Sequence, residues 1–155
     1  ALSSAASDVY KRQTAACGCG KHGCLEQYSS ATGVVRCMKK LLDENPDTPC
    51  TLRGTEFAAK DVFDAARNGD ALAAREVDEM TDTLGMALAN VANTVDPEMF
   101  MIGGGVSRAG EVLFAPLREH FQVYAFKSCR ETPIVPAILG NDAGIYGSVR
   151  LIVGE

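Results

Sequence analysis

A short loop with three closely spaced cysteines constrains this chain more than any other stretch. Cys17, Cys19 and Cys24 lie within eight residues, and glycines separate them in the sequence Cys-Gly-Cys-Gly-Lys-His-Gly-Cys. Thiolates at this density suit a tetrahedral zinc site, and glycine lets the backbone turn tightly around an ion. The spacing predicts metal binding by these three thiols; a cluster of ordinary thiols is the alternative that the sequence leaves open.

A carboxylate, Glu26, follows two positions after the last of these cysteines and begins a helical stretch. The helix dipole favours a carboxylate near a helix N-terminus, which is an ordinary structural reason for this residue. An ionised carboxylate can also accept hydrogen bonds from two neighbouring hydroxyl groups. Both interpretations of Glu26 stay open on the residues alone.

The composition excludes several classes of protein. A length of 155 residues suits one domain, and 46% hydrophobic with 23% charged residues indicates a globular chain. The net charge of −5 and the lack of a basic stripe argue against a nucleic-acid partner. The apolar runs are too short for a membrane span, and no signal peptide is evident. Cysteines that crowd into one loop or stand singly suit a reducing cytoplasm better than a disulfide-bonded fold.

Residues 1–13 have no apolar period and are expected to be a leader without function. The sequence Asp-Val-Tyr-Lys-Arg-Gln at positions 8–13 can be encoded by the transposon end used to prepare sequencing libraries, which would make this segment a translated adapter scar. An ordinary flexible leader is the alternative. We expect residues 14–155 to be the native part, and under the adapter interpretation the chain starts in mid-gene.

Helices are predicted over much of the remaining chain. Apolar residues recur at helical spacing in residues 32–44, 58–68 and 70–95, and Asn45-Pro46, Gly69 and Asp96-Pro97 end these stretches. The expected buried positions are, in order, Val34, Val35, Met38, Leu41 and Leu42; Val62, Phe63 and Ala66; and Val77, Met80, Leu84, Ala87, Val91 and Val95.

A glycine triplet follows a predicted buried strand at residues 98–102. Gly103, Gly104 and Gly105 would let the backbone approach a ligand closely, but a tight turn explains them about as well. Another helix is expected over residues 109–124, where Pro116 should kink it or start a second helix. A second strand, near a sheet edge, is expected over residues 132–139, followed by a last helix that Asn141 or Asp142 caps.

Several of these stretches resemble the ROK family of repressors, open reading frames and kinases. The pattern Cys-x-Cys-Gly-x-x-Gly-Cys-x-Glu resembles the zinc and sugar signature of that family, and residues 25–33 are similar to its bacterial glucokinase branch. Residues 101–107 look like the adenosine-side motif of sugar kinases, and residues 140–148 resemble the closing motif of the family. The resemblance runs from Thr14 to the end of the chain, in the family's order.

The resemblance implies a fold and a set of site residues. The fold class is α/β, the C-terminal part of an actin-like ATPase (ribonuclease-H-like) sugar kinase domain, helix-rich with few strands. By resemblance, Glu26 contacts the sugar, glycines 103–105 lie against the nucleotide, and Cys17, Cys19 and Cys24 hold a structural Zn²⁺. The family's fourth zinc ligand is a histidine from an upstream Glu-x-Gly-His segment that is absent here. We expect His22 to be solvated and His120 to cap a helix or face solvent.

The resemblance also implies an activity. Bacterial glucokinases transfer the γ-phosphoryl group of ATP to the 6-hydroxyl of glucose, with ATP, Mg²⁺ and zinc as cofactors and glucose or a related hexose as partner. The parent protein is expected to be a cytoplasmic homodimer. The family's catalytic base and phosphate-binding turns come from an N-terminal half, so we expect no catalytic residue in this chain, no activity of the chain alone, and apolar helix faces left exposed.

Three alternatives stay open. Some ROK proteins are sugar-sensing transcriptional repressors, with a helix-turn-helix ahead of a similar body. A kinase for another hexose, such as N-acetylmannosamine, is the second, and a zinc-binding module without a sugar is the third. An upstream aspartate base or an upstream recognition helix would distinguish a kinase from a repressor, and titration with glucose would identify a module that binds only metal.

Overall fold

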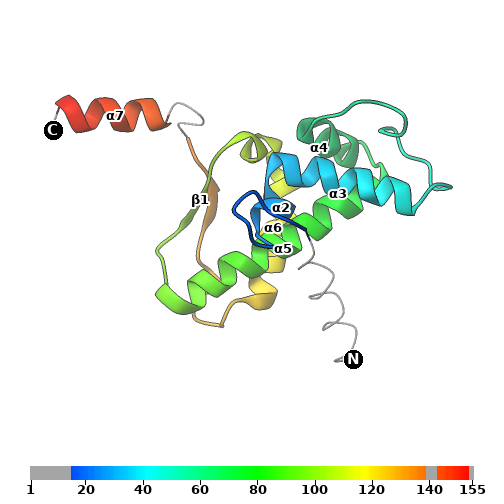
Figure 1. The fold of residues 1–155 in the computed structure, drawn as a ribbon. Coiled ribbons are helices and arrows are strands. Elements are labelled where there is room, and N and C mark those ends of the chain that lie inside the picture. The colour runs from blue at the N-terminus through cyan, green and yellow to red at the C-terminus, as the bar shows by residue number, and fades with distance from the viewer. Residues whose placement is uncertain (1–14, 139–142, 154–155) are drawn as a thin grey trace.

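The structure, a computed structural model, describes residues 15–138 and 143–153 (Figure 1). All of its helices except the last pack on one another, and a small two-stranded sheet lies beside them. In chain order the elements are α2 (Glu26–Ser29), α3 (Ala31–Glu44), α4 (Ala59–Arg67), α5 (Ala71–Val95), β1 (Phe100–Ile102), the 3-10 helix η1 (Gly105–Ala109), α6 (Glu111–Tyr124), β2 (Ile134–Pro136) and α7 (Ala143–Val153).

Side-chain caps begin two of the predicted helices. The Ser30 hydroxyl accepts a hydrogen bond from the backbone N–H of Gly33 at 3.0 Å, which starts α3. Asp70 accepts from the N–H groups of Leu72 and Ala73 at 3.1 and 3.2 Å and starts α5. These bonds satisfy donors that the first helical turn leaves unpaired, so the polar residues before each apolar stripe set the helix boundaries.

The buried face of α5 differs from the predicted one in its C-terminal half. Val77 and Met80 are buried as expected, but Val91 and Val95 are 47% and 65% exposed, and Ala89 and Ala92 are buried instead. The face turns because small residues let α6 approach closely, and the bulky valines then lie on the outside. The predicted apolar stripe was therefore wrong beyond Gly85.

Gly85 marks the close approach of α5 and α6. A Cβ atom at this position would lie 2.9 Å from the backbone nitrogen of Phe121, nearer than real Cβ contacts occur. Phe121 is 1% exposed, together with the buried Leu113 and Leu117 of the same helix. The absence of a side chain at residue 85 therefore lets α5 and α6 approach this closely.

We expect Gly85→Ala to lower the free energy of unfolding by about 1–3 kcal/mol, because the new methyl group forces the α6 backbone outward. Urea denaturation followed by circular dichroism measures this change. Gly144→Ala is the matched control, because a Cβ there meets nothing within 4 Å. Equal unfolding midpoints for Gly85→Ala and the unaltered chain would contradict the close approach.

Polar bonds also join α5 to α6. His120 Nε2 lies 2.8 Å from Asp78 Oδ1, and the Tyr124 hydroxyl donates to Asp82 Oδ1 at 2.6 Å. The ring of His120, which was expected to cap a helix or face solvent, is partly exposed and bonds to Asp78 of α5. The α6 helix continues through Pro116, so the alternative of a second helix starting at that proline is wrong.

The sheet is smaller than predicted. β1 pairs with β2 in parallel, with Phe100 opposite Ile134 and Ile102 opposite Pro136. Each strand has three residues, against the longer strands expected over 98–102 and 132–139. The prolines explain part of this, because Pro136 has no N–H to donate to a longer ladder. Even so, a helix-rich fold with few strands agrees with the sequence prediction.

The last helix, α7, extends away from the rest of the chain (Figure 1). Its side chains from Gly144 to Val153 are exposed, including the large apolar Ile145, Leu151 and Ile152. A Cβ built at Gly144 or Gly147 meets no atom within 4 Å, so neither glycine marks a close contact with another described element. The predicted caps, Asn141 and Asp142, lie outside the described residues. Within the described ranges, no helix is long and apolar enough to cross a membrane.

Candidate metal and sugar site

A tight hairpin turn builds the cysteine loop. Ala16 and His22 form an antiparallel bridge, and the Cys17 N–H donates to the Lys21 carbonyl at 2.8 Å. Gly20 and Gly23 have φ values of +83° and +71°, which residues with a side chain rarely adopt. The glycines between the cysteines therefore fold the backbone back on itself.

The turn brings the three thiols together. The Sγ atoms of Cys17, Cys19 and Cys24 all lie within 4.8 Å of one another, and those of Cys19 and Cys24 are 3.5 Å apart. Zinc–sulfur bonds of about 2.3 Å at tetrahedral angles place two ligand sulfurs about 3.8 Å apart. The three thiols therefore fit one face of a tetrahedral zinc site.

The pKa values of two of these thiols shift in opposite directions. A hydrogen bond from the backbone of Lys21 lowers the pKa of Cys19, and hydrogen bonds from the neighbouring thiols lower it further. The hydrogen bond to Cys19 raises the pKa of Cys24 to about 11, with Cys17 adding to the rise. Cys19 is therefore the first of the pair to become a thiolate, and a metal ion would displace the remaining protons.

Glu26 lies directly beside this cluster. Its Oε2 atom is 3.7 Å from the Sγ of Cys17, and it is the first residue of α2. The side chain is exposed, so a polar ligand can reach both carboxylate oxygens. Backbone hydrogen bonds connect α2 to the cysteine loop. Among them, the N–H of Gln27 donates to the Cys24 carbonyl at 2.9 Å, which holds Glu26 close to the thiols.

A second candidate region, the glycine turn, follows β1. Gly104 has a φ of +80°, and Cβ atoms built at Gly104 or Gly105 would meet nothing within 4 Å. The Ser107 hydroxyl donates to the Gly104 carbonyl at 2.8 Å and closes the turn. At Gly103 a Cβ would touch only the side chain of Ala137, at an ordinary 3.7 Å. The backbone of this turn is thus open on one side, and a planar group could lie against it.

Most of the chain matches one protein family. A profile of the ROK family matches residues 7–155. The chain belongs to the ROK family. The match begins within the segment expected to be a leader, and the boundary at residue 13 stays a prediction.

Other ROK proteins are similar over most of this chain. It is 42% identical over 142 residues to a glucokinase from Halalkalibacterium halodurans and 40% identical over 140 residues to one from Thermotoga maritima. These alignments cover 89% and 88% of this chain but 43% and 44% of the two relatives. The chain thus spans less than half the length of these curated relatives.

Solved ROK structures share the fold. The chain superposes with a TM-score of 0.76 and 33% identity on a ROK glucokinase from Streptomyces griseus, crystallised with glucose and AMPPNP; the match covers 90% of this chain and 47% of that one. The chain therefore has the fold of part of an actin-like ATPase sugar kinase domain. ROK relatives with other names are also similar, among them a Shewanella N-acetylgalactosamine kinase at 31% identity and a Caldicellulosiruptor bescii xylose repressor at 30%.

The structure joins some predicted site residues of this ROK chain and separates others. The three cysteines and Glu26 form one cluster, as their spacing predicted. Within the described ranges, no hydrogen bond or ion pair links the glycine turn to this cluster. Among the residues that the structure describes, three metal-ligating atoms are grouped in this cluster, and no fourth lies with them. His22 is not part of this group, and His120 is held by Asp78, so neither completes the set.

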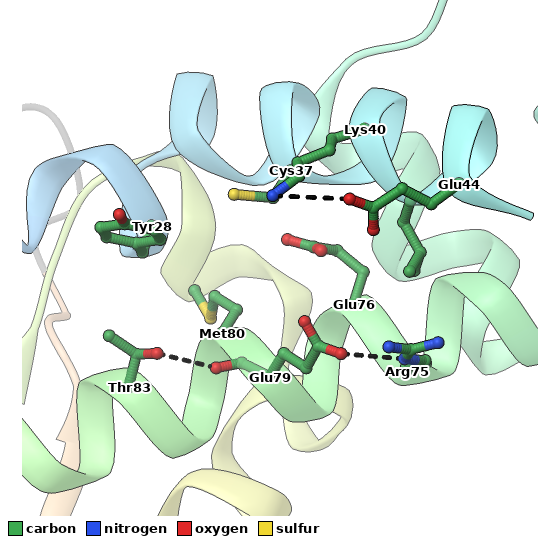
Figure 2. A pocket seen from close by; sticks show the side chains of 10 residues that line it. Tyr28, Cys37, Lys40, Glu44, Arg75, Glu76, Glu79, Met80 and Thr83 are labelled. Atoms are coloured by element: carbon green, nitrogen blue, oxygen red, sulfur yellow. Dashed lines mark hydrogen bonds and ion pairs between the residues drawn. The ribbon is translucent and has the colours of Figure 1, made fainter. Parts of the chain in front are cut away.

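One buried acid was missed by the sequence prediction. Glu76 of α5 is 3% exposed, between α3 and α5 (Figure 2). The signal was present, because Glu76 is three residues after the buried Ala73 and four before the buried Met80, on the apolar face of the helix. Apolar periodicity alone does not identify a charged residue as buried, even when it lies on the apolar face of a helix.

Proposed function

We propose that residues 14–155 are the C-terminal part of an ATP-dependent hexose kinase of the glucokinase type, which transfers the γ-phosphoryl group of ATP to the 6-hydroxyl of glucose. In this proposal the chain grips the sugar and holds a structural zinc ion. Identities of 42% and 40% to two glucokinases support it, as does the likeness to a glucokinase crystallised with glucose and AMPPNP.

The observation that carries the proposal is the position of Glu26. Its carboxylate is exposed, and it begins a helix directly after a loop that three thiols can clamp around one metal ion. An ionised carboxylate held this way accepts hydrogen bonds from two adjacent sugar hydroxyls without first losing much side-chain freedom. When bound, zinc would supply rigidity to the turn, and no step of the transfer is assigned to it.

The remaining parts of the reaction have fewer residues in this chain. Glycines 103–105 would lie against the adenosine side of ATP, where the open backbone at Gly104 and Gly105 leaves room. We assign no residue of this chain to Mg²⁺ or to the general base that accepts the hydroxyl proton. Both would come from the part of the relatives that this chain does not span. We therefore expect the 155-residue chain alone to be inactive. We expect its whole parent to be a cytoplasmic homodimer.

A sugar-sensing repressor is the second candidate, because a xylose repressor is 30% identical over 90% of this chain. Such a protein would use the same Glu26 and thiol cluster to bind its inducer. The higher identity to glucokinases favours the kinase. N-acetylated hexoses are further candidate substrates, because an N-acetylgalactosamine kinase is 31% identical.

We expect Glu26→Gln, introduced in the whole parent protein, to weaken glucose binding about 10- to 100-fold. A hydrogen bond to a charged group contributes about 1.5–3 kcal/mol, and the amide keeps the shape while losing the charge. Isothermal titration calorimetry with glucose measures the change. Glu98→Gln, at an exposed position outside the cluster, is the control. Unchanged glucose affinity in Glu26→Gln would overturn the sugar-binding role, and tight binding without phosphoryl transfer would favour the repressor.

A further inference from the structure

A cavity of about 490 Å³ lies between α3 and α5, beside α2 (Figure 2). None of its lining residues belongs to the cysteine loop or to the glycine turn. The cavity is therefore separate from both of these regions. A volume of this size suits a small organic molecule, since ligand pockets range over about 300–1,000 Å³.

The charged groups that line the cavity do not balance. Lys40 Nζ pairs with Glu44 at 3.6 Å on α3, and Arg75 Nε pairs with Glu79 at 2.8 Å on α5. After these two pairs, one lining carboxyl remains, that of Glu76. Figure 2 shows it projecting from α5 toward α3, between the two pairs.

Glu76 is a buried residue, and its carboxyl faces the cavity without a partner. The residue is 3% exposed, and among the residues that the structure describes it makes no hydrogen bond or ion pair. Burial raises its pKa to about 8, and the nearby Glu79 carboxylate adds to the rise, while Arg36 and Arg75 oppose it. A buried acid with no partner is costly in its ionised form, and a cation of the right size would remove that cost.

The other walls of the cavity indicate what kind of cation fits. Leu41 and Met80 offer apolar surface, and the Tyr28 ring lines one end. A bare metal ion does not fit, because within the described ranges only the cysteine loop groups three ligating atoms. The groups that face Glu76 across the cavity or from nearby are Tyr28 of α2, Arg36, Cys37, Lys40 and Glu44 of α3, and Arg75 and Glu79 of α5.

We propose that this cavity binds a small organic molecule that carries a primary ammonium group, with the ammonium paired to Glu76 and the carbon chain against Leu41 and Met80. A primary ammonium has three N–H donors and no acceptor, which matches a carboxylate that lacks donors. Binding requires the ionised carboxylate, so affinity rises as the pH passes through the pKa of Glu76.

Methionine-methyl NMR tests this on the 155-residue chain, with butylammonium chloride as the probe. We expect butylammonium to shift the Met80 methyl signal saturably and to leave the exposed Met101 signal in place. Binding should be about tenfold or more tighter at pH 8.5 than at pH 6.5, because a carboxyl with a pKa of about 8 ionises over this range. n-Butanol, which has the same chain without the charge, should produce no saturable shift.

Two variants separate the ammonium site from a general effect of charge. Glu76→Gln keeps the shape and should weaken butylammonium binding at least tenfold, with the remaining methyl signals showing that the chain is folded. Glu119→Gln removes one exposed charge on α6 and should bind as the unaltered chain does. An absent Met80 shift, an equal shift with n-butanol, or unchanged affinity in Glu76→Gln would each overturn the proposal.

Discussion

Replacement of Cys24 by serine is expected to weaken zinc binding by about 10²–10³-fold. Structural zinc sites bind with about 10–16 kcal/mol shared among four ligands, so each ligand contributes about 2.5–4 kcal/mol. The Sγ atom of Cys24 also lies 3.5 Å from that of Cys19, so the loss of this thiol opens one edge of the site. Competition with a chromogenic chelator at fixed pH measures the affinity of each variant.

Cys50→Ser is the matched control for Cys24→Ser. Cys50 is a partly buried thiol outside the loop, and within the described ranges it belongs to no group of three ligating residues. We expect this variant to bind zinc as the unaltered chain does. Equal zinc affinities for the two variants, or no zinc bound by the unaltered chain, would contradict the assignment of Cys17, Cys19 and Cys24 as ligands.

The cysteine loop was the part of the site that sequence could predict best, because its geometry is local. Ligand spacing and two left-handed glycines, Gly20 and Gly23, are enough to bring thiols within reach of one ion. The placement of Glu26 follows for the same reason, since it lies two residues beyond the last thiol. The sugar-binding role of Glu26 stays a prediction.

Helix positions could be predicted where a cap and a periodic stripe coincide, as at Ser30 and Asp70. What could not be predicted is which helix approaches which. The face of α5 depends on the close approach of α6 at Gly85, and the pairing of His120 with Asp78 joins residues 42 positions apart. Neither leaves a local signal, because long-range packing decides both.

The helix position of Glu76 was predictable from the sequence, but the groups that surround its side chain were not. In the folded chain burial raises the pKa of Glu76 to about 8, above its ordinary value of 4.5. Below about pH 4.5 the carboxyl is protonated in both the folded and the unfolded chain, and it does not affect stability. As the pH rises toward 8, the unfolded chain loses the proton while the folded chain keeps it, so the free energy of unfolding falls.

We therefore expect Glu76→Gln to stabilise the chain increasingly as the pH rises. Relative to the unaltered chain, its free energy of unfolding should gain about 3–4 kcal/mol between pH 5 and pH 8.5, because one pKa unit corresponds to about 1.4 kcal/mol. Urea denaturation at both pH values measures this difference. Glu119→Gln, at an exposed position, should show the same difference from the unaltered chain at both pH values. If Glu76→Gln behaved in that pH-independent way too, the Glu76 carboxyl would have to ionise at its ordinary pKa in the folded chain. That would require a charged partner, which the walls of the cavity between α3 and α5 do not supply.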